Sequence, residues 1–315
     1  MNMTPETIAV IDIGSNSIKI LVAGRFGLGR ALYSVFYKTL EARISAGISK
    51  TNPTLTAESM ARGIAAIQEL LADAARFAPA RTILVATSAV RDALNGVEFR
   101  RRVRDATGHD IRILSGVEEA SYIGRGLACD PNLAGLRDFY VFDLGGGSLE
   151  CLAFLNRNIV SEISLHLGCV RLTEKFVSDP AQPLPPAALR AINAHTKTTL
   201  ADSGFAFNLP PTATAIVTGG TTTTARAILG AAAGKTLEET SPCLALVDLR
   251  ALLDRVTSVD LAARRAMPGM PFGRADVFPT ALATLVALAE AASFSAFQTS
   301  LYNLRWGIAD EAMGK

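Results

Sequence analysis

Two matching stretches decide the fold: Val10-Ile11-Asp12-Ile13-Gly14-Ser15-Asn16-Ser17 and Val141-Phe142-Asp143-Leu144-Gly145-Gly146-Gly147-Ser148. Each places an aspartate inside an apolar run and a glycine two residues later, where the chain must turn. A second apolar run follows each turn, over residues 17–23 and 148–155, so each stretch predicts a β-hairpin. An opening motif that occurs twice indicates two related lobes.

Strand and helix patterns alternate after each hairpin, which is typical of an α/β fold. A chain of 315 residues suits two medium domains. We expect a first lobe over residues 1–120, with residues 298–315 folding back onto it, a second lobe over residues 121–297, and a ligand cleft between them. Apolar spacing predicts strands over residues 81–86, 111–114, 138–144 and 214–217, helices over residues 57–77, 88–104, 117–127 and 187–200, and a mostly helical last third.

The composition excludes several classes of protein. Hydrophobic residues make up 49% of the chain and charged residues 19%, which supports large cores and argues against disorder. The net charge of +2 lacks the basic excess that is typical of nucleic-acid-binding proteins. The apolar stretch over residues 281–292 is too short to span a bilayer and predicts a buried helix. We therefore expect neither a nucleic-acid partner nor a membrane partner.

The cysteines and the start of the chain favour a cytoplasmic location. Cys129, Cys151, Cys169 and Cys243 form no C-x-x-C pair, so reduced thiols are favoured over a zinc site or a disulfide framework. The start, Met1 to Glu6, shows no basic segment followed by a long apolar core, so we expect no signal peptide.

The two hairpins carry the chemistry expected of a phosphate site. A carboxylate in a buried strand, such as that of Asp12 or Asp143, is costly unless it is paired, hydrogen-bonded or bound to a cation. The glycine turn that follows lets backbone amides approach a ligand and cradle phosphate oxygens. One such copy is typical of an ordinary turn, whereas two copies in matching strands favour phosphate binding. The candidate phosphate-binding residues in the two turns are Gly14, Ser15, Asn16, Ser17, Gly145, Gly146, Gly147 and Ser148.

A third element over residues 216–222 has the same character. It reads as a strand, then two glycines, then the start of a helix. The free amides of a helix N-terminus form an anion site, which would add Gly219, Gly220 and Thr221 to the phosphate-binding residues. The alternative is a plain helix cap by threonine. Beside the two hairpins, phosphate binding is favoured.

These motifs together resemble those of the Ppx/GppA phosphatases, from about Ile8 to the end of the chain. The two hairpins and the Thr-Gly-Gly-Thr segment carry the resemblance first. Further similar segments are Thr87-Ser88-Ala89-Val90-Arg91-Asp92-Ala93-Leu94-Asn95, Leu114-Ser115-Gly116-Val117-Glu118-Glu119-Ala120 and Gly168-Cys169-Val170-Arg171-Leu172-Thr173-Glu174.

The resemblance implies a fold, a metal and roles for individual residues. The implied fold is the actin-like, or ribonuclease H-like, ATPase superfold: two α/β lobes around an interdomain cleft. Glu119 matches the family's proposed general base, which activates a water molecule. Asp143 and Glu150 match residues implied in metal and water binding, with Asp12 as a third candidate ligand. The expected metal is Mg²⁺ or Mn²⁺, since magnesium prefers oxygen ligands.

Two charged residues of the matched segments have more than one interpretation. Arg91 would neutralise phosphate charge as a further catalytic residue, because a guanidinium can engage two oxygens. Its alternative is a surface ion pair with Asp92 or Glu98. Glu118 is expected to contribute only favourable charge at a helix N-terminus.

Some positions depart from the repeat or from the family pattern. Lys19 in the first hairpin occupies the place of Glu150 in the second, which suits phosphate on one side and metal or water on the other, unless Lys19 simply faces solvent. Trp306 stands where the family often has an acidic residue. The chain resembles the short, two-domain form, so we expect a preference for short or intermediate polyphosphate with modest processivity. A homodimer would be one way to lengthen the polyanion track.

The expected function is that of an exopolyphosphatase, which hydrolyses the terminal phosphoanhydride of polyphosphate. Hydrolysis of a phosphorylated guanine nucleotide, guanosine pentaphosphate, is the alternative within the family. A kinase on the same superfold would have to exclude water, whereas the Glu-Glu-Ala segment favours water activation. A non-catalytic sensor of polyphosphate or nucleotide is the third alternative, and it would predict the loss of Glu119 or Asp143. The basic cluster at residues 100–104 predicts a solvated face rather than a polyanion track.

Overall fold

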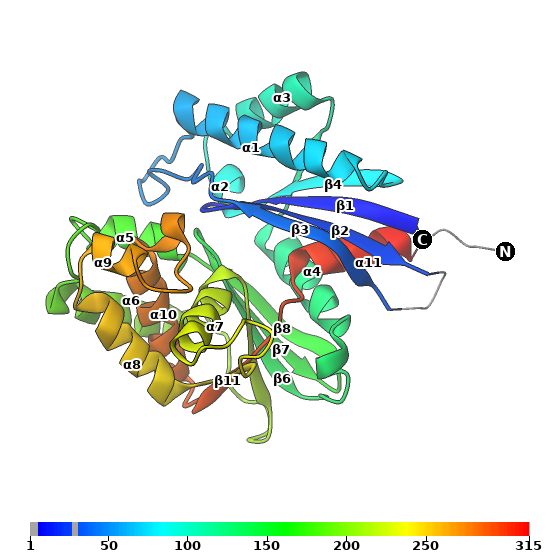
Figure 1. Ribbon diagram of the computed structural model, residues 1–315. Helices are drawn as coiled ribbons and strands as arrows, with labels where there is room; N and C mark the ends of the chain where they lie inside the picture. The colour runs from blue at the N-terminus through cyan, green and yellow to red at the C-terminus, as the bar shows by residue number, and fades with distance from the viewer. Residues whose placement is uncertain (1–5, 27–30, 315) are drawn as a thin grey trace. The chain divides into compact units, whose positions relative to one another are not determined.

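The computed structural model describes residues 6–26 and 31–314 (Figure 1). Residues 1–5, where no signal peptide is expected, lie outside the described residues, as do residues 27–30 and 315. The chain divides into two compact units: Met1–Gly135 with Tyr302–Lys315, and Leu136–Leu301. The boundaries expected from the sequence, after residues 120 and 297, fall inside helix α4 (Gly116–Ala128) and strand β11 (Ala296–Thr299).

Unit 1 contains a five-stranded sheet in the order β3-β2-β1-β4-β5. The first three strands form an antiparallel meander, and β4 and β5 run parallel to β1. This is the ribonuclease H-like order that the family resemblance implies. The strands are β1 (Glu6–Ile13), β2 (Ile18–Arg25), β3 (Tyr33–Leu40), β4 (Arg81–Ala86) and β5 (Ile111–Ile113).

Helices cover both faces of the unit 1 sheet (Figure 1). Helix α1 (Ala57–Ala75) packs on one face and contacts α3 (Gly96–Thr107), whereas α11 (Leu304–Met313) packs on the other face and against α4. The α4 and α11 backbones touch at Gly126 and Gly307, because a β-carbon on either residue would collide with the other helix. Helix α11 therefore braces α4, the helix that carries Glu119.

The helix predicted over residues 88–104 is two helices, so that prediction is wrong. The structure has α2 (Ser88–Arg91), a break, and then α3. The Asn95 side chain explains the break, because its Oδ1 accepts from the Leu55 amide and its Nδ2 donates to the Leu55 carbonyl, both at 2.8 Å. Asparagine side chains that bond to backbone groups in this way compete with helix formation.

Unit 2 contains a six-stranded sheet in the order β10-β11-β9-β6-β7-β8. Strands β6, β7 and β8 form the antiparallel meander, β9 and β11 run parallel to β6, and β10 is antiparallel at the edge. The same ribonuclease H-like order thus recurs, and the predicted fold class is confirmed unit by unit. The strands are β6 (Phe139–Leu144), β7 (Leu149–Leu155), β8 (Asn158–Leu165), β9 (Thr214–Thr218), β10 (Cys243–Ala245) and β11.

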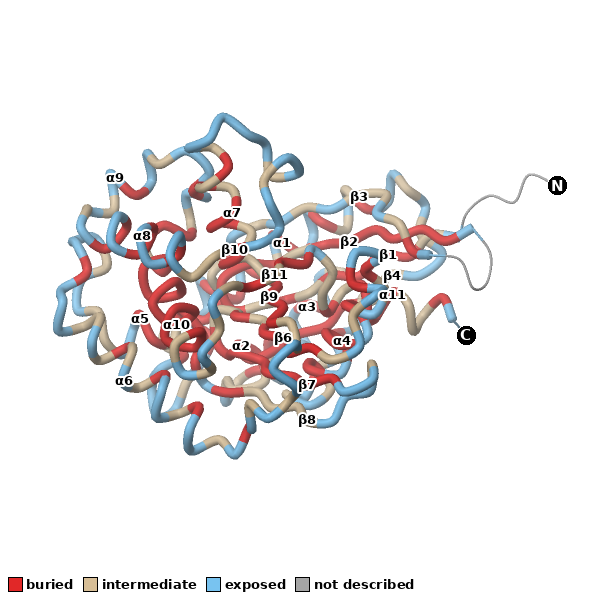
Figure 2. Tube along the Cα trace, turned by 90° about the horizontal axis from the view of Figure 1, so that it is seen from below, coloured by how far each residue is buried: buried red, intermediate tan, exposed pale blue. Residues whose placement is uncertain are grey.

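Helix α10 (Phe278–Ala291) is the buried centre of the helical part of unit 2 (Figure 2). It packs against four other helices of the unit and confirms the buried helix predicted near residues 281–292. None of the helices in the described ranges is long and apolar enough to cross a membrane. The four helices that contact α10 are α5 (Cys169–Phe176), α6 (Pro186–Asp202), α7 (Gly220–Ala232) and α8 (Leu246–Thr257), and α9 (Leu261–Arg265) is a further helix of the unit.

Candidate active site

The two repeated turns have the same backbone geometry. In unit 1 the Gly14 amide donates to the Ser17 carbonyl at 3.1 Å, and in unit 2 the Gly145 amide donates to the Ser148 carbonyl at 3.0 Å. The amides between these bonds, at residues 15–17 and 146–148, donate to no acceptor among the residues that the structure describes. Each unit therefore offers a row of backbone N–H groups suited to an anion.

The unit 1 turn is held by a neighbouring loop. The Arg43 amide donates to the Asn16 carbonyl at 2.9 Å, and the Ser45 hydroxyl donates to the Ser15 carbonyl at 3.0 Å. On the other side, the Ser15 hydroxyl shares a hydrogen bond with the Ser88 hydroxyl of α2 at 3.0 Å. Because its carbonyls are already occupied, the turn leaves its amides for a ligand.

Helix α2 also positions the predicted general base. Arg91, at the end of α2, donates from Nη1 to Glu119 Oε2 at 2.8 Å and to the Leu114 carbonyl at 3.1 Å. Glu119 is only 7% exposed. The Arg91 Nε atom also lies 3.5 Å from Asp92 Oδ1, so one of the two alternative ion pairs is present. The structure thus brings Glu119, Arg91 and the Ser15 turn together within unit 1.

Glu118, next to the predicted base, has a structural role. Its Oε2 accepts from the Ser115 amide at 2.8 Å, while the Ser115 hydroxyl accepts from the Glu118 amide, which is a capping box at the start of α4. The Ser115 amide, followed by the Arg112 guanidinium, lowers the pKa of Glu118 to about 2. Glu118 is therefore fixed in the helix cap, as its position in the sequence suggested.

The cross-strand partner of the repeated aspartate differs between the units. In unit 1, Asp12 lies opposite Lys19 across the β1–β2 hairpin. In unit 2, Asp143 lies opposite Glu150 across the β6–β7 hairpin. Glu150 is only 2% exposed, and its Oε1 accepts a hydrogen bond from the Ser164 hydroxyl at 2.7 Å. Two carboxylates side by side repel each other unless a cation compensates for them.

The Asp143–Glu150 pair fits a magnesium ion better than a zinc ion. The described residues contain no cluster of three or more His, Cys, Asp or Glu side chains that could hold a metal alone. Magnesium does not need one, because it keeps several water ligands and binds through one or two carboxylates together with substrate phosphates. The two opposed carboxylates supply that donor set, whereas Asp12 faces the position of a lysine and suits a cation less well.

The unit 2 turn is braced by the first turn of α5. The amides of Cys169 and Val170 donate to the carbonyls of Gly145 and Gly146 at 3.0 and 2.8 Å. Arg171 Nε donates to the Gly147 carbonyl at 2.9 Å. A β-carbon at residue 168 would collide with the turn, so only glycine lets α5 approach this closely.

The third predicted element is a helix N-terminus with an acidic neighbour. Helix α7 begins at Gly220, and no side chain caps it, so the plain threonine cap is absent. Gly219 has φ of +93°, and a β-carbon there would collide with Oδ1 of Asp143. The Thr221 hydroxyl donates to the Leu144 carbonyl at 3.4 Å, which ties α7 to the end of β6. Asp143, the glycines and the Gly145–Ser148 turn therefore converge in unit 2.

Arg274 is a residue of this region that sequence reasoning missed. It is only 7% exposed, yet its guanidinium forms no hydrogen bond or ion pair with any residue that the structure describes. The guanidinium lies against Gly220, where a β-carbon would collide with it. A buried cation without a partner at a helix N-terminus suits a bound anion. No sequence motif near residue 274 predicts that this arginine lies beside the start of α7.

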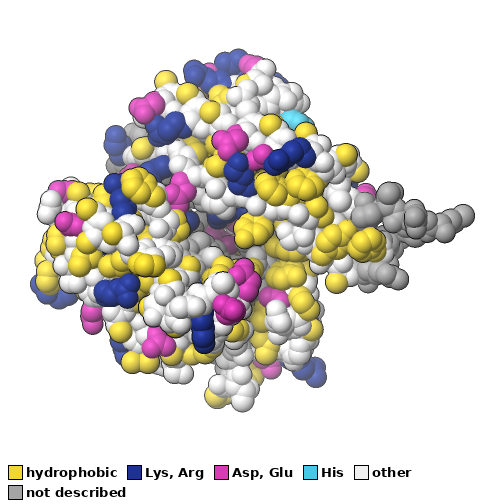
Figure 3. Space-filling model, viewed as in Figure 1, with side chains coloured by type: hydrophobic (Ala, Val, Ile, Leu, Met, Phe, Trp, Pro, Cys, Tyr) yellow, Lys and Arg dark blue, Asp and Glu magenta, His cyan; other side chains and the backbone are white. Residues whose placement is uncertain are grey.

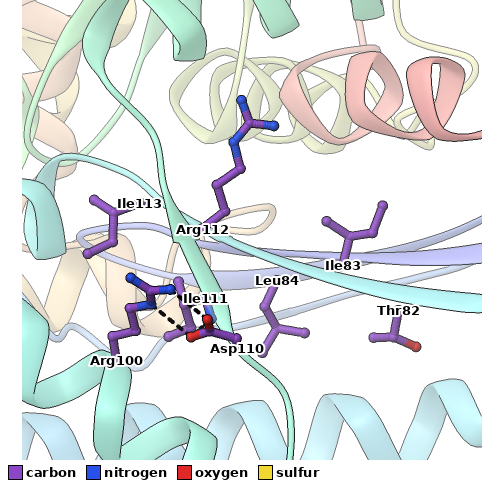
Figure 4. A pocket seen from close by; sticks show the side chains of 8 residues that line it. All are labelled: Thr82, Ile83, Leu84, Arg100, Asp110, Ile111, Arg112 and Ile113. Carbon is purple, nitrogen blue, oxygen red and sulfur yellow. Dashed lines mark hydrogen bonds and ion pairs between the residues drawn. The ribbon is translucent and has the colours of Figure 1, made fainter.

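A groove of about 470 Å³ lies at the β4–β5 edge of unit 1, apart from these residues. Its charged side chains are paired. Arg100 binds Asp110 at 2.5 Å, and Arg112 points to the other side of β5 (Figure 4). There Arg112 binds Glu118 at 2.6 Å. The groove flanks the first half of β4, whereas the Ser15 turn and α2 lie at the other end of that strand. It adds nothing to the phosphate chemistry.

The basic cluster at residues 100–104 is largely a set of surface ion pairs. Arg101 and Arg102 both bind Glu98, and Arg101 also binds Asp105. On the face drawn in Figure 3, basic side chains over α1 and α3 lie beside acidic ones. This arrangement agrees with a solvated face rather than a polyanion track.

Comparisons with known proteins agree on one family. The sequence model of the Ppx/GppA phosphatase family matches residues 22–315. Exopolyphosphatase 2 of Mycobacterium tuberculosis is 35% identical over 187 residues, which cover 56% of this chain and 57% of the relative. The match therefore spans little more than half of that relative's length.

Solved structures show the same fold. An exopolyphosphatase from Cytophaga hutchinsonii has a TM-score of 0.86 at 23% identity, with 98% of each chain covered. The Ppx/GppA enzyme of Aquifex aeolicus has a TM-score of 0.77 at 22% identity, with 99% of this chain and 100% of that chain covered. Identities this low establish the likeness of the fold alone.

Proposed function

Because the chain belongs to the Ppx/GppA phosphatase family, we propose that it hydrolyses the terminal phosphoanhydride bond of inorganic polyphosphate with an activated water molecule. The observation that carries the proposal is the buried Glu119 carboxylate, which Arg91 holds next to α2 and the Ser15 turn. A carboxylate fixed beside a phosphate-binding turn is suited to orient a water and to accept its proton.

Arg91 has two compatible roles in this proposal. Its Nη1 atom fixes the Glu119 carboxylate and the Leu114 carbonyl, so it holds the base in place. A guanidinium beside the site is also suited to stabilise the phosphoryl oxygens on which negative charge builds up during hydrolysis. Loss of Arg91 would then both misplace the base and weaken charge neutralisation.

We propose that unit 2 contributes phosphate and metal binding. Asp143 and Glu150 would hold Mg²⁺ or Mn²⁺, with Asp12 of unit 1 as a weaker candidate ligand. A bound magnesium ion would offset part of the phosphate charge. The amides of residues 146–148 and the N-terminus of α7 would bind phosphoryl oxygens, and the unpaired guanidinium of Arg274 would compensate for their charge.

The test is phosphate release by the purified full chain from polyphosphates of defined length. Guanosine pentaphosphate and ATP serve as competing substrates, each assayed with and without magnesium. We expect magnesium-dependent release from polyphosphate at the highest kcat/KM. Faster release from guanosine pentaphosphate would favour the nucleotide activity, and no release from any substrate would refute the proposal. Light scattering on the same preparation tests whether the chain forms a homodimer.

A further inference from the structure

The Asn16 side chain in the unit 1 turn is held on one side only. Arg43 donates from Nε and from Nη2 to the same acceptor, Asn16 Oδ1, at 3.1 and 3.0 Å. Because both guanidinium nitrogens donate to Oδ1, the carbonyl end of the Asn16 amide points toward Arg43 and the Nδ2 end faces away from it. Asn16 is only 3% exposed, and its Nδ2 has no hydrogen-bond partner among the residues that the structure describes.

A buried amide donor without an acceptor is unfavourable. Leaving such a donor unsatisfied costs roughly 1–3 kcal/mol in a folded protein. Asn95 in the same unit shows the usual arrangement, since both ends of its amide are bonded to Leu55. The unpaired donor of Asn16 belongs to the same turn as the free amides of residues 15–17. The oxygens of a phosphate bound at the turn would supply acceptors for these donors.

Arg43 is itself held in an unusual conformation. Its φ is +38°, in the left-handed region that non-glycine residues rarely adopt, and such conformations persist only where the surroundings impose them. The surrounding contacts are visible: the Arg43 amide donates to the Asn16 carbonyl, and Arg62 Nη2 donates to the Arg43 carbonyl at 3.2 Å. Main chain and side chain of Arg43 thus bind the same residue of the turn.

We propose that Arg43 is a positioning residue, which turns the Asn16 amide so that Nδ2 donates a hydrogen bond to an oxygen of the bound phosphate. The inference rests on the proposed function and deepens it by naming a side-chain donor and the residue that orients it. Arg43 then acts through Asn16, and its effect on phosphate binding depends on the asparagine being present.

A double-mutant cycle tests this dependence. The ligand is methylenediphosphonate, a pyrophosphate analogue that cannot be hydrolysed, and its Kd is measured by calorimetry. Arg43→Lys keeps the positive charge but loses the pair of guanidinium N–H donors that bind Asn16 Oδ1. Asn16→Ala removes the Nδ2 donor. We expect each to weaken binding about tenfold or more, because hydrogen bonds to charged groups are the strong ones. The double variant should bind methylenediphosphonate with an affinity no lower than that of the weaker-binding single variant.

A second comparison separates binding from folding. Asn16→Asp keeps the acceptor for Arg43 but replaces the buried unpaired donor with an oxygen. The midpoint of thermal unfolding should therefore stay equal or rise, while the affinity for methylenediphosphonate should fall. Asn95→Asp is the matched control: it removes a satisfied donor, so it should lower the midpoint and leave affinity unchanged.

Several results would overturn the inference. If the fold-losses in affinity of the two single variants multiply in the double variant, Arg43 binds the ligand directly. If Arg43→Lys keeps the wild-type affinity, only the positive charge of Arg43 matters. An Asn16→Asp protein with unchanged affinity would exclude the donor. If the wild type binds the analogue but does not hydrolyse polyphosphate, the proposed function fails while this inference stands. If the wild type hydrolyses polyphosphate but does not bind the analogue, this inference fails while the proposed function stands.

Discussion

The two phosphate-type turns share a backbone but differ in what surrounds them. Both close with one hydrogen bond across the turn, from Gly14 in unit 1 and from Gly145 in unit 2. In unit 1 a loop holds the turn largely through the side chains of Arg43 and Ser45. In unit 2 two main-chain amides of α5 do so, together with the Arg171 side chain. One turn therefore depends on side chains that substitution can remove, and the other on a helix.

The charges beside the turns differ as well. The aspartate of unit 1 lies opposite a lysine, and that of unit 2 lies opposite a glutamate. The shared backbone supplies N–H donors in both units, whereas the cross-strand residue decides whether a cation fits. The comparison teaches that the two copies of the motif share their turn geometry, while a single cross-strand residue changes the charge beside each turn.

The largest expected effect concerns the proposed general base, Glu119, which lies in unit 1. Glu119→Gln keeps the shape and the contact with Arg91 but removes the basicity, so kcat should fall by about 10²–10⁴. Stopped assays of phosphate release measure this, and circular dichroism checks the fold. Glu118→Gln is the control, because glutamine also completes a capping box and should leave kcat nearly unchanged. Near-normal turnover in Glu119→Gln would show that another group activates the water.

The next effect tests the acidic pair of unit 2. Glu150→Gln keeps an oxygen for the Ser164 hydroxyl but removes the charge. The magnesium concentration for half-maximal activity should rise by about 10–100-fold, as it does when groups supporting a metal are lost. Lys19→Gln at the matching position of unit 1 should not raise it. Equal shifts in both variants, or full activity in excess chelator, would contradict the assignment of the metal to unit 2.

Two buried arginines of unit 2 give the third comparison. Arg274→Ala removes an unpaired cation, so KM should rise about tenfold while the free energy of unfolding stays equal or increases. Arg264→Ala removes a guanidinium that donates to four backbone carbonyls, so it should destabilise the protein by roughly 3 kcal/mol or more. Urea titrations and initial rates measure both. If Arg274→Ala is the more destabilising of the two, Arg274 is structural rather than ligand-binding.

The smallest effect tests the loop that holds the unit 1 turn. Ser45→Ala removes one hydrogen bond to the Ser15 carbonyl, which should cost about 1 kcal/mol of stability and raise KM only a few-fold. Urea unfolding and initial rates measure these changes. A loss of activity as large as that of Glu119→Gln would mean that this loop, and not the base, limits turnover.

Much of the site could be predicted from the sequence because its main elements are local. A hairpin needs only an apolar run, a turn and a second apolar run, and both predicted hairpins are present. The strand, glycine and helix sequence at Thr218–Thr221 is present for the same reason. The cleft between the lobes, the catalytic roles and the metal stay predictions.

Other features depend on residues far apart in the chain. The break before α3 arises because Asn95 binds Leu55, and no local pattern encodes that contact. The strands β10 and β11 are three and four residues long, too short to stand out in a mostly helical last third. Trp306, which stands where the family often has an acidic residue, has a buried ring whose centroid lies 4.2 Å from that of Tyr302, so its ring contact is a local one.

By itself, the sequence determined the α/β class, the duplicated hairpins and the family, because these follow from hydrophobic periodicity, glycine turns and short motifs. Only the tertiary structure decided which side chains meet which partners: Arg91 meets Glu119, Arg43 meets Asn16, and Arg274 lies against Gly220 at the start of α7. The physical reason is that a buried charge or amide is defined by its partners, and packing brings those partners from segments that the sequence separates.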